Sequence, residues 1–164
     1  GSDFSYLLGQ NNGMFLKINV FKSWMKPVPI IIEYDNGVEQ EGFLSDNISI
    51  IYFALGPTFR LNLKYDQASF YINPGIGMQF YRNKSAIIDK FFTKGNTLGF
   101  GFDVGYDKNI SKNIGVGLNF SYTLGFLKDV TIIGDEIEEH YQFNELKYAN
   151  ITRFEFGLSL RFRS

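Results

Sequence analysis

Apolar and polar residues alternate through almost the whole of residues 51–81. The apolar residues occupy odd positions up to residue 65 and even positions from residue 68 onward. Side chains alternate between the two faces of a strand, so each half predicts a strand with one apolar and one polar face. A two-residue turn at Tyr65-Asp66 accounts for the change of parity and places Gly56 opposite Gly75. The pattern therefore predicts a β-hairpin.

The same alternation predicts further strands on both sides of this hairpin. Apolar residues alternate with glycine and polar residues over 98–106, 114–126 and 154–162, and more loosely over 14–25. Around Asn36-Gly37, a dipeptide typical of hairpin turns, the short apolar arms 30–34 and 42–44 predict either two brief strands or one long loop. No stretch has the apolar period of a helix.

The connections between these strands differ in length. Residues 65–66 and 108–112 are short turns, whereas 83–96 and 128–150 are long and polar, and the second of them is acidic. We expect both long segments to be loops. Residues 1–12 are polar and predict a lead-in without regular structure, and Gly1-Ser2 resembles a remnant of cloning. A cleaved signal peptide would leave no trace in this sequence.

Composition supports a single all-β domain over residues 1–164. The chain has 18 Phe, 10 Tyr and 17 Gly, and this combination of aromatic residues and glycine favours strands over helices. The formal charge of −1 gives no basic field for nucleic acid. Cysteine is absent, which excludes disulfides, thiol catalysis and cysteine metal sites. No apolar run is long enough for a transmembrane helix.

The two faces of the predicted strands differ in bulk, and this difference favours a membrane barrel. The apolar registers carry Phe, Leu, Ile and Tyr, and the other registers carry the glycines together with small polar residues. A barrel of about eight strands is only just wide enough inside for its side chains, so the bulky residues would overfill it. We therefore expect the bulky face to meet lipid. A soluble sandwich or a lipocalin-like barrel that binds an apolar ligand is the alternative, with the bulky face inward.

Four segments resemble the small outer-membrane β-barrel proteins, the OmpA/OmpX-type eight-stranded barrels. They are Ala54–Arg60, Tyr71–Gly77, Gly99–Tyr106 and the closing Phe154–Phe162, and the resemblance covers about residues 48–162. The closing segment is similar to the strand that the barrel-assembly machinery recognises, although Arg163 and Ser164 follow its final aromatic residue. The first third departs from the family's even series of hairpins. Either the arms around Asn36-Gly37 are its second and third strands, or its first strands precede this sequence.

The resemblance implies an up-and-down antiparallel barrel of about eight strands that spans a bacterial outer membrane. Short turns and the C-terminus would face the periplasm, and the loops 83–96 and 128–150 would face outward. The implied partners are outer-membrane lipids, lipopolysaccharide and, during biogenesis, the barrel-assembly machinery. We expect no nucleic acid partner.

Five charged residues in the polar registers are candidates for the interior of such a barrel: Arg60, Asp103, Arg153, Glu155 and Arg161. Buried charges must be paired or hydrated, and both signs are present. We expect an ion-pair network that plugs the interior. A narrow polar conduit or a ligand pocket is the alternative.

No catalytic, cofactor or metal site is expected. The single histidine, His140, has no serine near it in sequence, and the outward segments offer only Ser85. A lipid-modifying barrel enzyme is therefore the weakest interpretation. The acidic residues Asp135, Glu136, Glu138 and Glu139 lack the ligand spacing of a calcium loop, so we interpret them as a solvated segment.

Overall fold

The computed structural model shows an all-β chain. It describes residues 2–7, 11–33, 37, 39–63, 67–86, 90–111, 114–134, 138–143 and 148–162. For residues 2–7, 32–33, 86, 90 and 161–162 it describes the backbone alone. Among the described residues, no helix is long and apolar enough to cross a membrane.

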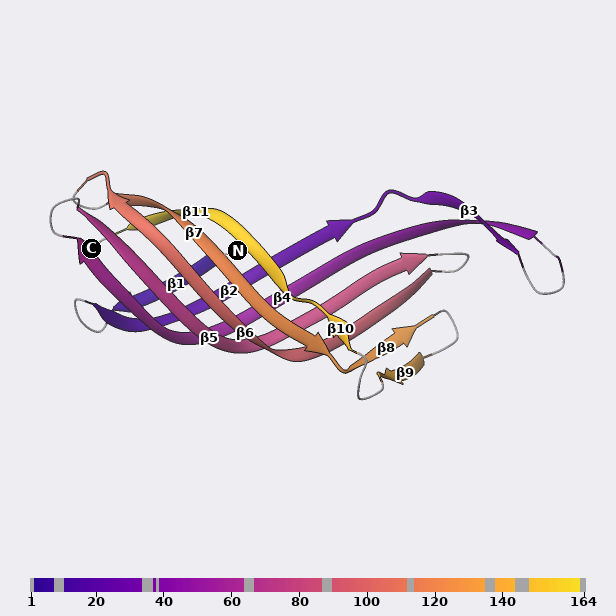
Figure 1. Ribbon diagram of the computed structural model, residues 1–164. Helices are drawn as coiled ribbons and strands as arrows, with labels where there is room; N and C mark the ends of the chain where they lie inside the picture. The colour runs from indigo at the N-terminus through magenta and orange to yellow at the C-terminus, as the bar shows by residue number, and fades with distance from the viewer. Residues whose placement is uncertain are drawn as a thin grey trace.

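All strands belong to one hydrogen-bonded sheet (Figure 1). They are β1 (Ser2–Leu7), β2 (Asn12–Trp24), β3 (Val28–Glu33), β4 (Glu39–Leu63), β5 (Ala68–Ala86), β6 (Lys90–Asn109), β7 (Ile114–Leu127), β8 (Asp129–Ile133), β9 (Glu138–Gln142), β10 (Ala149–Asn150) and β11 (Arg153–Phe162).

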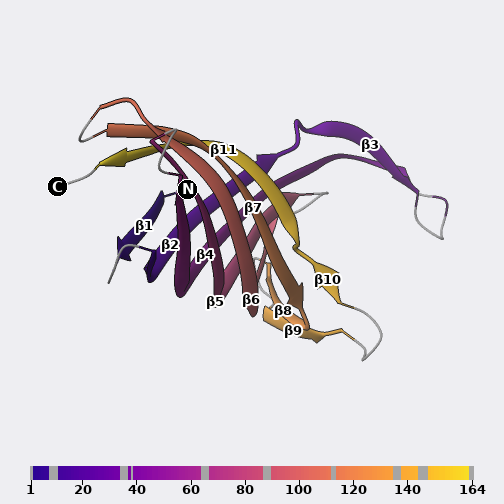
Figure 2. The same ribbon diagram turned by 60° about the vertical axis from the view of Figure 1, so that its left-hand side comes forward.

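The long strands follow one another around a curled antiparallel sheet, a half-barrel. The order is β1-β2-β4-β5-β6-β7, and both β10 and β11 pair with the far side of β7. Figure 2 shows the strands side by side with a marked twist and curl. The predicted antiparallel all-β fold is therefore confirmed.

The β4–β5 hairpin has the predicted register. Leu55 lies opposite Ile76 and Phe59 lies opposite Ile72, so Gly56 and Gly75 fall at matching positions between these pairs. The ladder is interrupted at this level, where Pro57 and Pro74 lie opposite each other and neither can donate a backbone hydrogen bond. The predicted turn at Tyr65-Asp66 lies outside the described residues.

The apolar register lies on the exposed convex face, and the glycine-rich register lies on the concave face. Phe53, Phe59, Phe100 and Phe102 are exposed, whereas Lys17 and Asp103 are almost completely buried. This is the arrangement that the volume of the side chains predicts, because the small and polar residues fit inside the curl.

Three segments expected to lack strands contain them. In residues 1–12, β1 pairs with β2 along its whole length. Residues 83–96 continue β5 and β6 almost to the tip of their hairpin, with Lys84 opposite Phe92. The cationic ends of Arg82 and Lys84 lie 5.4 and 5.6 Å from the Phe92 ring centroid. Such contacts let a strongly polar segment remain a strand in solvent, which composition alone does not reveal.

Residues 128–150 also contain strands. β8 continues β7 along β6 with the register offset by one residue, so that Ile133 lies opposite Phe92, and β9 pairs with β8. β10 pairs with the last residues of β7. Of the two alternatives for residues 26–48, the structure has paired strands: β3 lies antiparallel to the first residues of β4. In Figure 1 this β3–β4 hairpin projects beyond the rest of the sheet, at the end opposite the C-terminus.

Candidate functional site: the polar interior of the curled sheet

The concave side of the sheet holds an unusual number of buried polar and charged side chains. They come from strands far apart in sequence and include Lys17, Asn19, Thr58, Ser69, Asn73, Gln79, Asp103, Asp107, Ser121, Thr123 and Arg153. Burying a charge is costly unless it is paired and hydrogen-bonded. The partners of these groups therefore decide what the interior can do.

An ion pair between Lys17 and Asp103 occupies the middle of the interior. The Lys17 Nζ atom lies 2.7 Å from Asp103 Oδ1 and donates a second hydrogen bond to Ser121 Oγ at 2.9 Å. The three residues belong to β2, β6 and β7, so the lysine reaches across the concavity. Both charged side chains are almost fully buried, so the pair is screened little by solvent.

A second charged group lies toward the short turns. Arg60 Nη1 lies 3.2 Å from Asp107 Oδ2 and donates to Ser69 Oγ at 2.9 Å. The other oxygen of Asp107 accepts a hydrogen bond from Ser159 on β11 at 2.7 Å. This arrangement ties β4, β5, β6 and β11 together. Thr58 and Asn73 form a buried side-chain hydrogen bond between β4 and β5.

A third group lies on the opposite side of the central pair. Arg153 Nε lies 2.9 Å from Glu155 Oε1 on the same strand, and Arg153 Nη1 donates to Gln79 Oε1 at 3.5 Å. Asn19 Nδ2 donates to Glu155 Oε2 at 2.5 Å. The Arg153 guanidinium also lies 5.9 Å from the ring centroid of the buried Tyr52. These contacts connect β2, β4, β5 and β11.

A small apolar cluster covers this third group from the side of the projecting hairpins. Its buried members are Ile50, Leu127, Val130 and Ile151, and the partly buried Tyr81, Ile132 and Phe143 pack against it. Val130 comes from β8, so the strand that continues β7 along β6 supplies part of the cover. The described interior thus contains ion pairs and hydrogen bonds at three levels and aliphatic side chains at a fourth.

Glycines make room for the larger interior side chains. A Cβ atom at Gly105 would lie 2.2 Å from the Tyr71 ring, and one at Gly125 would lie 2.2 Å from Gln79 Nε2. Gln79 lies over Gly99 and Gly125, which are opposite each other in register, and its Nε2 donates to the carbonyl of Leu124 at 2.7 Å. The glycine-rich registers therefore create the space that Tyr71 and Gln79 occupy.

Four of the five candidate interior charges lie in this network, and Arg60 and Asp103 pair with residues outside the predicted set. Arg60 pairs with Asp107, Asp103 pairs with Lys17, and Arg153 pairs with Glu155. The backbone of Arg161 lies opposite Gly115, and its side chain is outside the described part of the structure. Sequence analysis missed Lys17 and Asp107 as site residues. The available signal was their place in the polar register of strands whose other face is apolar.

The other candidate groups that the structure describes lie outside the interior network. His140 is exposed on β9 opposite Thr131, and Glu138 forms an exposed ion pair with Lys94 at 3.6 Å. Asp135 and Glu136 are outside the described residues. Ser85 donates a hydrogen bond to Asp46 at 2.5 Å. Within the described part of the chain, no cluster of histidine and acidic residues could hold a metal ion.

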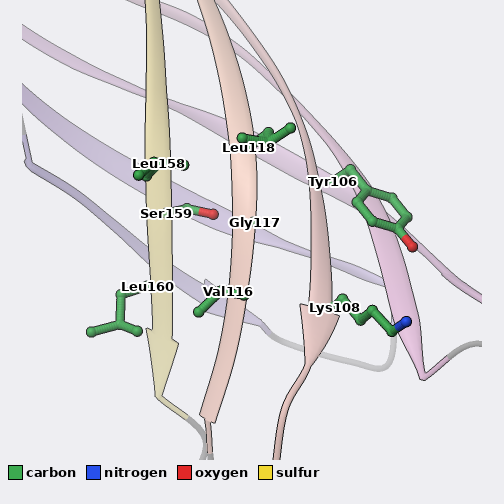
Figure 3. Close-up of a pocket in the computed structure, with 8 residues that line it drawn as sticks. All are labelled: Tyr106, Lys108, Val116, Gly117, Leu118, Leu158, Ser159 and Leu160. Atoms are coloured by element: carbon green, nitrogen blue, oxygen red, sulfur yellow. The ribbon is translucent and has the colours of Figure 1, made fainter.

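Two pockets accompany β11, one on each face. The concave pocket, of about 180 Å³, is polar, and its lining includes Lys17, Asn19, Asn119 and Glu155. The convex pocket, of about 610 Å³, is almost wholly apolar and lies over β6, β7 and β11 (Figure 3). Leu118, Leu158, Val116 and Leu160 form its aliphatic part, and the polar tips of Tyr106 and Lys108 point away from them (Figure 3).

Comparison with known proteins adds no family to this description. No protein-family model matches the chain, and no curated protein sequence matches it.

Proposed function

We propose that this chain is an integral β-barrel protein of a bacterial outer membrane, with a plugged polar interior and a non-enzymatic role. One observation carries the proposal: the apolar side chains are exposed around the convex face while the charged side chains are buried inside. Soluble proteins rarely expose contiguous apolar patches larger than a few hundred Å². A lipid environment removes that cost, because hydrocarbon then covers the Phe, Leu and Ile side chains.

The dimensions of the strands support this proposal. β2 has 13 residues and β7 has 14, and a tilted strand needs roughly 9–11 residues to cross the hydrocarbon core. At the short-turn end of the convex face, Tyr106 and Lys108 direct their polar tips away from the aliphatic side chains. Tyrosine and lysine commonly occupy the boundary between hydrocarbon and water in this way. The short turns would then mark the periplasmic side.

The interior contacts support the plugged state. Ion pairs and hydrogen bonds lie at three levels of the described interior, and the aliphatic cluster around Leu127 and Val130 lies at a fourth. Side chains at these levels would obstruct an aqueous path. They also disfavour the lipocalin-like alternative, since an apolar ligand would displace charged groups from one another. A lipid-modifying activity would need an activated nucleophile, and His140 lies exposed on β9, outside this network.

The projecting hairpins support a role in binding at the cell surface. Trp24, Ile31 and Phe43 are 69%, 68% and 61% exposed at or beyond the end of β2, on the side opposite the short turns. Large apolar side chains in such positions are typical of contact sites for other molecules. The proposed partners of the barrel wall are outer-membrane lipids and lipopolysaccharide, and the barrel-assembly machinery would act on the chain during insertion.

Extraction and gel mobility test the proposal. We expect the folded protein to require detergent and to migrate differently before and after heating in dodecyl sulfate. It should also incorporate into phosphatidylcholine vesicles and resist extraction by alkaline carbonate. A monodisperse, folded protein in detergent-free buffer would contradict the membrane assignment.

A further inference from the structure

The two outermost strands of the curled sheet each have a free edge. Among the described strands, β1 pairs only with β2, and β11 pairs only with β7. We call these two free edges the seam. The apolar side chains of β11 reflect this position: Phe156 and Leu158 are 74% and 84% exposed, compared with 39% for Phe120 and 47% for Leu118 on β7. Unpaired edges leave backbone groups without partners and promote aggregation.

Strand direction determines how the seam can close. The pairings β1–β2, β2–β4, β4–β5, β5–β6, β6–β7 and β7–β11 are all antiparallel. Six reversals leave β1 and β11 running in the same direction. Direct pairing of β1 with β11 would therefore be parallel. One additional strand between them would be antiparallel to both and would continue the pattern of the sheet.

The number of strands that the contacts across the interior span favours one additional strand in the seam. Lys17 on β2 reaches Asp103 on β6 across two intervening strands, and Arg153 on β11 reaches Gln79 on β5 across two others. Asn19 on β2 reaches Glu155 on β11 at 2.5 Å across the seam side, where only β1 intervenes. If one further strand lies beside β1, this contact also spans two intervening strands, as the other two contacts do.

The contact between Lys17 and Ser121 also indicates a single additional strand. It joins β2 to β7 at 2.9 Å, and β4, β5 and β6 lie between these strands on one side. On the other side lie β11 and β1. A single added strand makes three on each side, so β2 and β7 become opposite strands of an eight-stranded barrel, whose interior is filled by side chains.

Unsatisfied groups at the seam specify the chemistry of that strand. Asn19 Oδ1 and Asn119 Oδ1 are buried and accept no hydrogen bond from a described residue, and both side chains line the polar pocket beside the Glu155 carboxylate. The inward positions of the strand must therefore carry hydrogen-bond donors such as Thr, Gln or Lys. Its outward positions must be apolar, because they continue the exposed surface of Phe156 and Leu158.

We infer that a single extended polypeptide segment outside residues 1–164 occupies the seam, antiparallel to β1 and β11, with donor side chains inward and apolar side chains outward. A second copy of the chain does not fit. Two copies inserted in the same direction would place β11 beside the partner's β1 in parallel. The antiparallel arrangement would require one copy to be inverted. The inference rests on the barrel of the proposed function, and its exclusion of a second copy rests also on the insertion of all copies into a membrane in one direction.

The experiment uses the 164-residue protein in detergent micelles or, if it proves soluble, in buffer. A synthetic 12-residue peptide with alternating Leu or Val and Thr, Gln or Lys is added. A peptide of the same composition without alternation is the control. Amide hydrogen exchange of residues 153–162 is then measured. We expect exchange to slow by about tenfold or more with the alternating peptide only, since pairing must open before exchange occurs.

Cross-linking defines the register, because the chain has no cysteine of its own. Leu158→Cys, at an exposed position, should form a disulfide with a peptide that carries cysteine at one outward position and not with one shifted by a single residue. Glu155→Leu should remove the preference for lysine at the inward positions. Equal protection by both peptides would overturn the inference. So would a direct Phe4→Cys to Leu158→Cys cross-link without peptide, or protection that increases with protein concentration through a dimer.

Discussion

The ammonium group of Lys17 and the carboxylate of Asp103 lie 2.7 Å apart inside the curled sheet, although 86 positions separate the two residues in sequence. The contact forms only when the sheet curls enough to bring β2 and β6 face to face. It therefore reports on the closure of the fold as well as on the electrostatics of the interior.

Breaking this pair should destabilise the protein strongly. Lys17→Met leaves the Asp103 carboxylate buried without its partner, and removal of one member of a buried pair costs about 3–5 kcal/mol. The free energy of unfolding can be measured by urea titration in detergent or lipid. The double variant Lys17→Met/Asp103→Leu should recover most of the loss, because no charge then remains buried. Lys94→Met at the exposed Lys94–Glu138 pair is the control and should change the stability by about 0–1 kcal/mol.

The proposed contact of the convex face with lipid predicts that a charge on this face destabilises the protein. Phe102→Lys places an ammonium group near the middle of the proposed membrane-spanning part, and the expected cost is about 2–4 kcal/mol in a bilayer. Folding titrations into phosphatidylcholine vesicles measure this cost. Ile31→Lys is the matched control: Ile31 is also exposed, but it lies on the projecting β3–β4 hairpin. Equal effects of the two substitutions would indicate that Phe102 faces water.

We expect position 105 to require glycine, because the Tyr71 ring occupies the space that a side chain would need. Gly105→Ala places a methyl group 2.2 Å from the Tyr71 ring, and overpacking of this kind costs about 1–3 kcal/mol. Chemical unfolding of the single variant and of Gly105→Ala/Tyr71→Ser tests the cause. If the clash is responsible, alanine at position 105 should be less harmful in the Tyr71→Ser background. An unchanged penalty would assign the effect to the strand backbone.

The interior should not conduct ions. Planar bilayers that contain the wild-type protein should show no reproducible single-channel steps, because charged pairs and the aliphatic cluster fill the described interior. Combined replacement of Arg60 and Arg153 by alanine removes cations from two levels of the network and should produce steps if the ion pairs form the barrier. Regular steps in the wild type that change with Arg60→Ala alone would contradict the plugged interior.

The sequence predicted features that depend on neighbouring residues along one strand. Strict alternation over residues 51–81 determined the β4–β5 register, and the bulk of the two faces predicted which one is exposed. The partners of Arg60 and Asp103 could not be predicted, because they depend on the curl that brings distant strands together. Lys17 appeared only as a polar residue in a loosely alternating segment.

The polar segments were misinterpreted for a different reason. Residues 83–96 and 128–150 are rich in charged and polar residues, and composition therefore indicated loops. In the structure, cross-strand contacts such as those of Arg82 and Lys84 with Phe92 stabilise strands that extend into solvent. β1 was not predicted, because only a few residues alternate in it. Its pairing with β2 depends on the folded sheet and cannot be seen in the local sequence.

The projecting hairpin formed by β3 and the first part of β4 has one more consequence. In the curled sheet, even one added methyl group at Gly77 would lie 1.7 Å from the backbone oxygen of Phe53, so substitution there forces the strand backbone to shift. The side chains of Ile31 and Phe43 extend into open surroundings instead. Mutational freedom is thus concentrated on the arms of this hairpin, where the proposed binding role could change in specificity while the scaffold remains unchanged.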